Sequence, residues 1–131
     1  MQVTQARTEH DPKRVASAAL QVFFNLSERW GLHAKEEQVL LGHPPSSTFF
    51  AWKSKKTASR LSDDTLDRIS YLMGIHKALN ILLPSAHAAN DWIKKPNNAP
   101  LFGGDSALNR MLGGKLTDLA DVRRYLDAQR G

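Results

Sequence analysis

The sequence predicts an all-α fold made of two small helical modules. Apolar residues recur at spacings of three or four along most of the chain, as they do on one face of an α-helix. The alternation of β-branched residues that marks strands is almost absent, and glycines and prolines separate the periodic segments. The 131 residues suffice for one ordinary domain or two small ones.

The first helix is predicted to begin at Asp11-Pro12, where an N-cap residue is followed by a proline suited to the first helical position. Residues 1–10 before it are polar, and we expect them to be flexible. The helix ends at Gly31. Its apolar face is expected to comprise Val15, Ala19, Val22, Leu26 and Trp30.

Two short helices follow. One covers residues 34–41 and ends at Gly42. The stretch His43-Pro44-Pro45 cannot continue a helix, and Ser46 or Ser47 is expected to cap the next one.

A long helix is predicted from Ser62 to about Leu83, just before a proline. Ser62 supplies an N-cap, and Asp63 and Asp64 place negative charge in the first turn. Its apolar stripe is wider than one core face requires. The stripe predicts either burial on two sides, against another domain or a second subunit, or one thick core.

The last third of the chain is predicted to contain three further helices, over residues 85–95, 106–112 and 117–129. Leu119, Val122 and Leu126 share one face of the last of them. We place the domain boundary near Ser85. The organisation is thus a flexible segment at residues 1–10, a module at residues 11–84 and a second module at residues 85–131.

The composition excludes several classes of protein. Hydrophobic residues make up 41% and charged residues 24%, as in a globular domain rather than a disordered chain. The absence of cysteine excludes disulfides, thiolate catalysis and cysteine-ligated zinc or iron–sulfur sites. No apolar run approaches the roughly 18 residues that span a bilayer, and residues 1–13 lack the apolar core of a secretory signal. We expect a cytoplasmic protein with no membrane segment.

The net charge is +5, and the excess lies in the first half, with +4 in residues 1–60 and +1 in residues 61–131. A positive module attracts polyanions such as DNA, although charge alone predicts an ordinary basic surface equally well.

The order short helix, glycine turn, short helix is that of a DNA-binding helix-turn-helix, whose second helix enters the major groove. Phe49 and Trp52 are expected to form the inner face of that helix. Phe50 either faces outward, where it could meet a thymine methyl, or packs against a neighbour. The candidate DNA-contacting residues are polar or basic: Gln38, Ser46, Ser47, Thr48 and Lys53 around the recognition helix, and Lys55, Lys56 and Arg60 for phosphates.

An enzyme is not expected. The five histidines are scattered, with no pair at the spacing of a helical zinc site. The glycine pairs at residues 103–104 and 113–114 lack the strand and lysine of a phosphate loop. We therefore predict no catalytic residue, no metal and no cofactor.

The C-terminal third contains an ordered series of motifs. They are Trp92, Pro96-Asn97, Leu101-Phe102-Gly103-Gly104, Leu108-Asn109-Arg110-Met111-Leu112-Gly113-Gly114, Val122-Arg123-Arg124-Tyr125-Leu126 and Arg130-Gly131. This series resembles the toxin-binding domain of the Xre/MbcA/ParS antitoxin family. Glu37-Gln38, Leu40-Leu41-Gly42, Thr48 and Trp52-Lys53 look like that family's helix-turn-helix.

The resemblance implies an antitoxin of a type II toxin–antitoxin system. It would neutralise a RES-domain toxin, which depletes NAD, by covering the toxin's active site, and would repress its own operon by binding operator DNA. It implies a homodimer. The candidate toxin-binding residues are Phe102, Met111, Arg123, Tyr125, Arg130 and Gly131, the last residues entering the active site. Aromatic and methionine residues of this module could instead pack its own core.

Two departures from the family pattern stand out. Asp105-Ser106-Ala107 follows the first glycine pair, where the family often has a basic residue and a proline. The turn at residues 43–47 is one residue longer than usual, which moves the register of the recognition helix by one position. The alternative functions are a stand-alone dimeric helix-turn-helix repressor and an adaptor that does not contact DNA.

Overall fold

The computed structural model describes residues 11–131, and within them the chain forms helices and no strand. The α-helices are α2 (Pro12–Trp30), α3 (Ala34–Leu40), α4 (Ser46–Lys55), α5 (Asp63–Leu82), α6 (Ala86–Asp91), α7 (Ala107–Met111) and α8 (Leu116–Arg130), and a 3-10 helix, η1, spans Trp92–Lys94. The all-α prediction is confirmed. No helix of this part of the chain has the length and apolar character needed to cross a membrane. The flexible segment predicted for residues 1–10 lies outside the described residues.

Helix boundaries follow from capping residues that are visible in the sequence. Four side chains accept a hydrogen bond from a backbone N–H in the first turn of their helix, as N-caps do; they are Asp11, Ser62, Ser85 and Ser106. Gly31 ends α2 in the left-handed conformation at φ 64°, and its N–H bonds to the Glu28 carbonyl. Local chemistry therefore fixes where these helices begin and where α2 ends.

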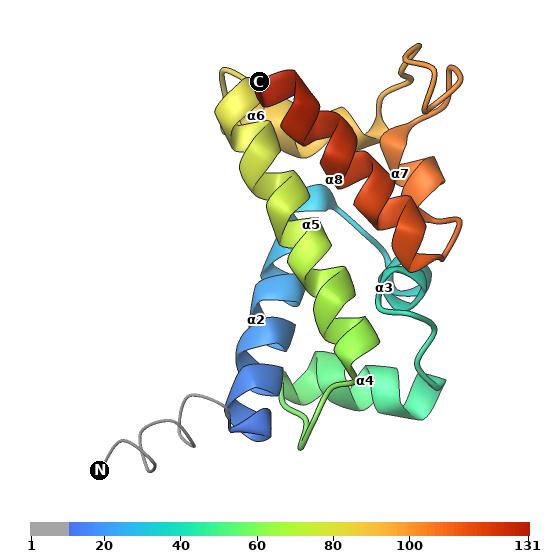
Figure 1. The fold of residues 1–131 in the computed structure, drawn as a ribbon. Coiled ribbons are helices and arrows are strands. Elements are labelled where there is room, and N and C mark those ends of the chain that lie inside the picture. The colour runs from blue at the N-terminus through green and yellow to red at the C-terminus, as the bar shows by residue number, and fades with distance from the viewer. Residues whose placement is uncertain (1–10) are drawn as a thin grey trace.

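The long helix α5 is the element that both modules share. It runs along the length of the molecule, with α2 against one side and α8 across another (Figure 1). Leu72, Ile75 and Leu79 are at most 1% exposed. The wide apolar stripe is thus buried on two sides within one chain, by α2 and by α8 of the second module, and its width requires no second subunit.

The buried face of α2 agrees with the predicted one at Leu26 and Trp30, which are 3% and 2% exposed, and differs from it nearer the N-terminus of the helix. Val15 and Val22 are each 37% exposed, whereas Leu20 and Phe23 are fully buried. Apolar residues occupy much of the circumference of α2, so two faces satisfy the spacing of three or four. The face that carries the aromatic rings removes more apolar area from water and turns inward.

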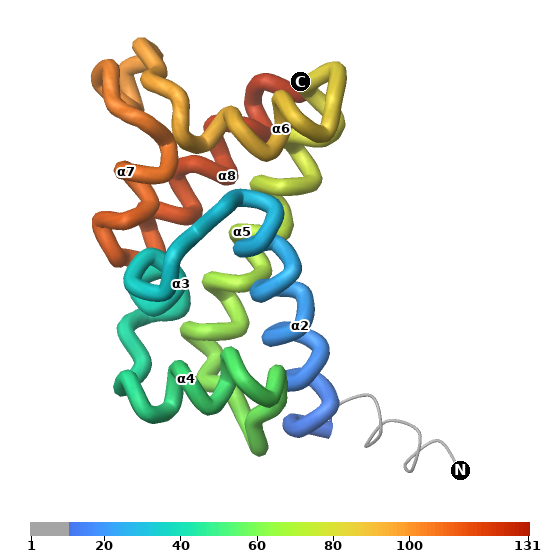
Figure 2. Tube along the Cα trace, turned by 180° about the vertical axis from the view of Figure 1, so that it is seen from behind, coloured from blue at the N-terminus to red at the C-terminus, as the bar shows by residue number. Residues whose placement is uncertain are grey.

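The second module folds over the upper half of α5. One end of the molecule contains α6, η1, α7, the loop between η1 and α7, and the last turn of α8 (Figures 1 and 2). Helix α4 lies at the opposite end. Leu119, Val122 and Leu126 of α8 are at most 2% exposed, which confirms the face predicted for them. The two ends of the molecule therefore present different modules to solvent.

Candidate functional site

The recognition helix α4 presents one buried and one exposed face. Phe49 is fully buried, with its ring centroid 6.1 Å from that of Phe24 on α2. The expected inner face is thus observed, with Trp52 half-buried beside it. The exposed residues of α4 are Ser46, Ser47, Phe50, Ala51, Ser54 and Lys55. Figures 1 and 2 show α2, α3 and α5 on one side of α4 only, so its outer face is open.

The turn before α4 explains where the recognition helix starts. Gly42 and His43 both adopt positive φ, at 95° and 60°, and this reverses the chain after α3. Pro45 then precedes the helix without a side-chain cap, so neither Ser46 nor Ser47 is the N-cap that the sequence predicted. Ser46 is instead the first helical residue, and its Oγ lies 3.3 Å from the Gln38 amide that donates to it.

Lys53, a predicted DNA-contacting residue, lies beside a buried carboxylate. Its Nζ is 2.7 Å from Oε1 of Glu37, whose side chain is 4% exposed. The Ser27 hydroxyl donates to Oε2 of the same carboxylate at 2.5 Å. These contacts join α2, α3 and α4 through one negative charge. Lys53 thus links the recognition helix α4 to α2 and α3. Its contact with DNA stays a prediction.

The three predicted phosphate-binding residues lie in two settings. Lys56 ends α4 in the left-handed conformation, and its Nζ lies 5.1 Å from the centroid of the Phe24 ring. Lys55 and Arg60 are exposed and form no ion pair within residues 11–131. They line an open hollow together with hydroxyl-bearing side chains, those of Ser47, Thr48, Thr57 and Ser59. Exposed cations among hydroxyl donors suit a phosphate backbone.

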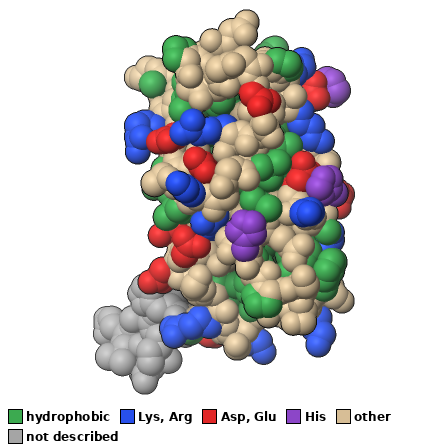
Figure 3. Space-filling model, turned by 90° about the vertical axis from the view of Figure 1, so that its right-hand side faces the viewer, with side chains coloured by type: hydrophobic (Ala, Val, Ile, Leu, Met, Phe, Trp, Pro, Cys, Tyr) green, Lys and Arg blue, Asp and Glu red, His purple; other side chains and the backbone are tan. Residues whose placement is uncertain are grey.

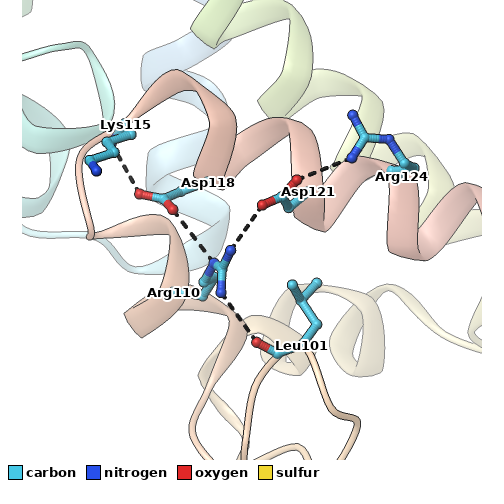
Figure 4. A network of polar contacts seen from close by, with 6 residues as sticks. All are labelled: Leu101, Arg110, Lys115, Asp118, Asp121 and Arg124. Atoms are coloured by element: carbon cyan, nitrogen blue, oxygen red, sulfur yellow. Dashed lines mark hydrogen bonds and ion pairs between the residues drawn. The ribbon is translucent and has the colours of Figure 1, made fainter.

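The second module contains a polar network centred on Arg110 of α7 (Figure 4). Its guanidinium lies 2.9 Å from Asp121 and 3.5 Å from Asp118, both on α8, and donates to the Leu101 carbonyl at 3.4 Å. Asp121 also pairs with Arg124 at 3.1 Å. The network fastens α7 and the preceding loop to α8. Sequence reasoning missed this role of Arg110, because the pairing joins residues on different helices.

The candidate toxin-binding residues divide by burial. Phe102 and Met111 are 6% and 1% exposed, so both side chains pack inside the module. The Phe102 ring makes an edge contact with Tyr125, with centroids 5.2 Å apart, and Tyr125 is half-buried. Of the predicted set, the residues that reach the surface are on α8 or just after it: Arg123, Tyr125, Arg130 and Gly131.

Arg123 and Arg130 both lie near Asp127, at 3.3 and 3.6 Å. The Arg123 guanidinium covers Gly74 on α5, where a Cβ would collide with it. This glycine therefore makes room for the side chain that links the two helices. Figure 3 shows acidic and basic side chains side by side over the upper part of one face, while lysine or arginine side chains occupy the lower edge, the end where α4 lies.

Both modules match known domain families. Residues 9–74 match the antitoxin Xre-like helix-turn-helix domain. Residues 78–131 match the C-terminal toxin-binding domain of the Xre/MbcA/ParS antitoxins. The chain belongs to the Xre/MbcA/ParS antitoxin family. It is also 47% identical over 114 residues to "Uncharacterized protein y4oB" of Sinorhizobium fredii, an alignment that covers 87% of this chain and 85% of that protein.

The family assignment confirms the resemblance read from the sequence. The two matches divide within α5, between residues 74 and 78, whereas the predicted boundary falls between residues 84 and 85 and stays a prediction. The name of the first matched family refers to the helix-turn-helix, a DNA-binding motif, and that of the second refers to the binding of a toxin. Within residues 11–131 no three histidine or acidic side chains gather where they could hold a metal ion.

Proposed function

We propose that this antitoxin neutralises a RES-domain toxin by covering the entrance to its active site, and that it represses its own operon by binding operator DNA. The observation that carries the proposal is the presence of both matched modules on one chain, joined by a helix that they share. The resemblance to the family supplies the toxin class and its NAD-depleting activity.

The arrangement of the two modules supports simultaneous binding. Helix α4, which ends at Lys55 shortly before Arg60, lies at one end of the molecule, and the last turn of α8, which carries Arg130, lies at the other (Figure 1). Within residues 11–131, Lys55 and Arg60 form no ion pair. A toxin held at the end of α8 therefore leaves α4 open to DNA. Arg130 is suited to a toxin's active site because a guanidinium can pair with carboxylates or occupy the place of a charged substrate.

A homodimer completes the proposal, since two helix-turn-helix units read half-sites about 34 Å apart. Helix α2 offers a surface for this dimer. Val15 and Val22, two turns apart on one face of α2, are both exposed. Light scattering at micromolar concentration tests this part, and a monomer would contradict it.

The decisive experiment is co-expression with a RES-domain toxin encoded beside the antitoxin, with growth and cellular NAD as readouts. We expect the full chain to restore both. Deletion of residues 128–131 removes the exposed end of α8 and should abolish rescue while leaving operator binding intact.

The reciprocal variant is Lys55→Ala with Arg60→Ala, which should lose operator binding and retain rescue. Failure of the full chain to restore growth or NAD at matched expression would overturn the toxin assignment. Full rescue by the truncated protein would instead remove residues 128–131 from the toxin interface.

A further inference from the structure

We propose that Phe50 determines operator sequence preference by packing its ring against the 5-methyl group of a thymine in the major groove. The inference rests on the proposed operator binding and adds to it the chemistry by which α4 distinguishes bases.

The exposed face of α4 is a stripe in which Phe50 is the largest side chain. Ser47, Phe50, Ala51 and Ser54 follow the spacing of three, four and seven residues that places side chains on one helical face. Phe50 is 52% exposed, whereas its neighbour Phe49 is fully buried. The register of α4 therefore places a large apolar ring where a recognition helix meets base edges.

The ring of Phe50 is supported at its inner side. Its centroid lies 4.9 Å from that of Phe49 in an edge-to-face contact, and Phe49 is packed in turn against Phe24. The ring is thus braced by the core while half of its surface remains in water. A braced aromatic side chain loses little conformational freedom when it binds.

Two lysines near this stripe are held by other groups of the protein, and the exposed Lys55 is the last residue of α4, beyond the stripe. Lys53 is paired with Glu37, and Lys56 lies over the Phe24 ring. The middle of the stripe consequently offers an aromatic ring, a methyl group and hydroxyls, and it carries no amide or guanidinium for a bidentate contact to purines. In the major groove, the apolar feature that such a surface matches is the thymine methyl.

The surroundings favour DNA over a protein as the occupant of this face. Lys55, on the same helix, and Arg60, a few residues beyond it, are exposed and unpaired within residues 11–131. They share a hollow with four hydroxyl-bearing residues, as a phosphate contact requires. An apolar side chain flanked by exposed cations complements a DNA groove lined by phosphates.

The test uses full-length protein and the operator located by footprinting of the DNA upstream of its gene. Each thymine of the half-site is replaced in turn by deoxyuridine, which removes only the 5-methyl group. We expect one position at which this replacement weakens wild-type binding about fourfold, the effect of one buried methyl-sized group. Phe50→Ala should weaken binding to the natural operator by about tenfold and bind the thymine and deoxyuridine duplexes equally. Phe50→Leu should retain part of the discrimination.

The matched control is Ile81→Ala, because Ile81 is a large hydrophobic residue of similar exposure, 55%, near the end of α5 farthest from α4. It should leave operator affinity unchanged. Both side chains are about half exposed, so the two variants should lower the thermal midpoint by similar, small amounts and keep the helical circular dichroism signal, which separates a DNA contact from misfolding.

Equal affinity of Phe50→Ala and wild type, or undiminished discrimination by Phe50→Ala, would overturn the inference while operator binding itself stands. A change of oligomeric mass in Phe50→Ala, with equal loss on all DNA sequences, would assign the residue to a protein interface and also overturn it. If the wild type binds no upstream DNA, the proposed repression fails, and the inference fails with it.

Discussion

Replacement of Lys53 by methionine tests whether the buried carboxylate of Glu37 holds the recognition helix in place. The variant keeps an unbranched apolar stem in place of the lysine methylenes and removes the ammonium that lies 2.7 Å from Oε1. Among residues 11–131, the Glu37 carboxylate then keeps the hydrogen bond from Ser27 and no other, while its own side chain is 4% exposed. A buried charge left with fewer partners destabilises the folded state.

The magnitude follows from the burial of the two partners. Breaking a fully buried pair costs about 3–5 kcal/mol, and a hydrogen bond to a charged group contributes about 1.5–3 kcal/mol. Because the Lys53 side chain is 40% exposed, water can replace part of the lost contact. We therefore expect a loss of about 2 kcal/mol in the free energy of unfolding, or roughly 8 °C in the melting midpoint of a chain of this length.

The measurement is urea unfolding followed by far-UV circular dichroism. The matched control is Lys95→Met, which breaks an exposed pair with Asp91 at 3.5 Å and should cost less than about 0.5 kcal/mol. On a Glu37→Gln background, Lys53→Met should cost about 1.5 kcal/mol less than it does alone, since the negative charge has gone. Equal costs for Lys53→Met and Lys95→Met, or no coupling with Glu37, would refute the reasoning.

Three further predictions follow from the charges and the core. Lys55→Ala and Arg60→Ala should each reduce the slope of log affinity against log salt by about one unit, as measured on operator and on unrelated DNA; an unchanged slope would exclude the phosphate contact. Burial and the charge of Arg29 lower the pKa of His76 from its usual value of 6.5. The unfolded chain therefore binds the proton more readily, so wild-type stability should fall as the pH drops from 7.5 through 6.5 and on through the lower folded pKa, and His76→Gln should lessen this loss in parallel unfolding curves. Leu126→Ala should cost about 2–5 kcal/mol in urea unfolding, because the side chain is 2% exposed; a cost below 1 kcal/mol would contradict its place in the core.

The sequence predicted those features of the fold that depend on neighbouring residues. Asp11, Ser62 and Gly31 set helix boundaries through bonds within a few positions, and these boundaries agree with the structure. The rotation of α2 about its axis could not be predicted in the same way. Ala19 and Leu20 both satisfy an apolar spacing, and only packing against other helices selects between the two faces.

In the candidate site, too, contacts between residues far apart in the sequence could not be predicted. Sequence position alone suggested that Lys53 faces DNA, because a lysine on a recognition helix is normally exposed. Its partner Glu37 is 16 residues away and meets it only after the turn at Gly42 has brought α3 and α4 together. The burial of Phe102 and Met111 likewise depends on how the second module closes on itself.

The shared helix has a consequence for how the two modules respond to a partner. Removal of the second module would uncover the side of α5 against which α8 packs, and would also remove the Lys94 ammonium from the Gly31 carbonyl, 3.2 Å away, at the end of α2. Gly114 lies against His43 in the turn that sets the recognition helix. The modules thus share one core, and the structure favours a single cooperative unfolding transition.

A partner that binds the folded second module at a concentration one hundred times its Kd adds about 2.7 kcal/mol of stability. Because unfolding is shared, that stabilisation extends to the helix-turn-helix, which the partner need not touch.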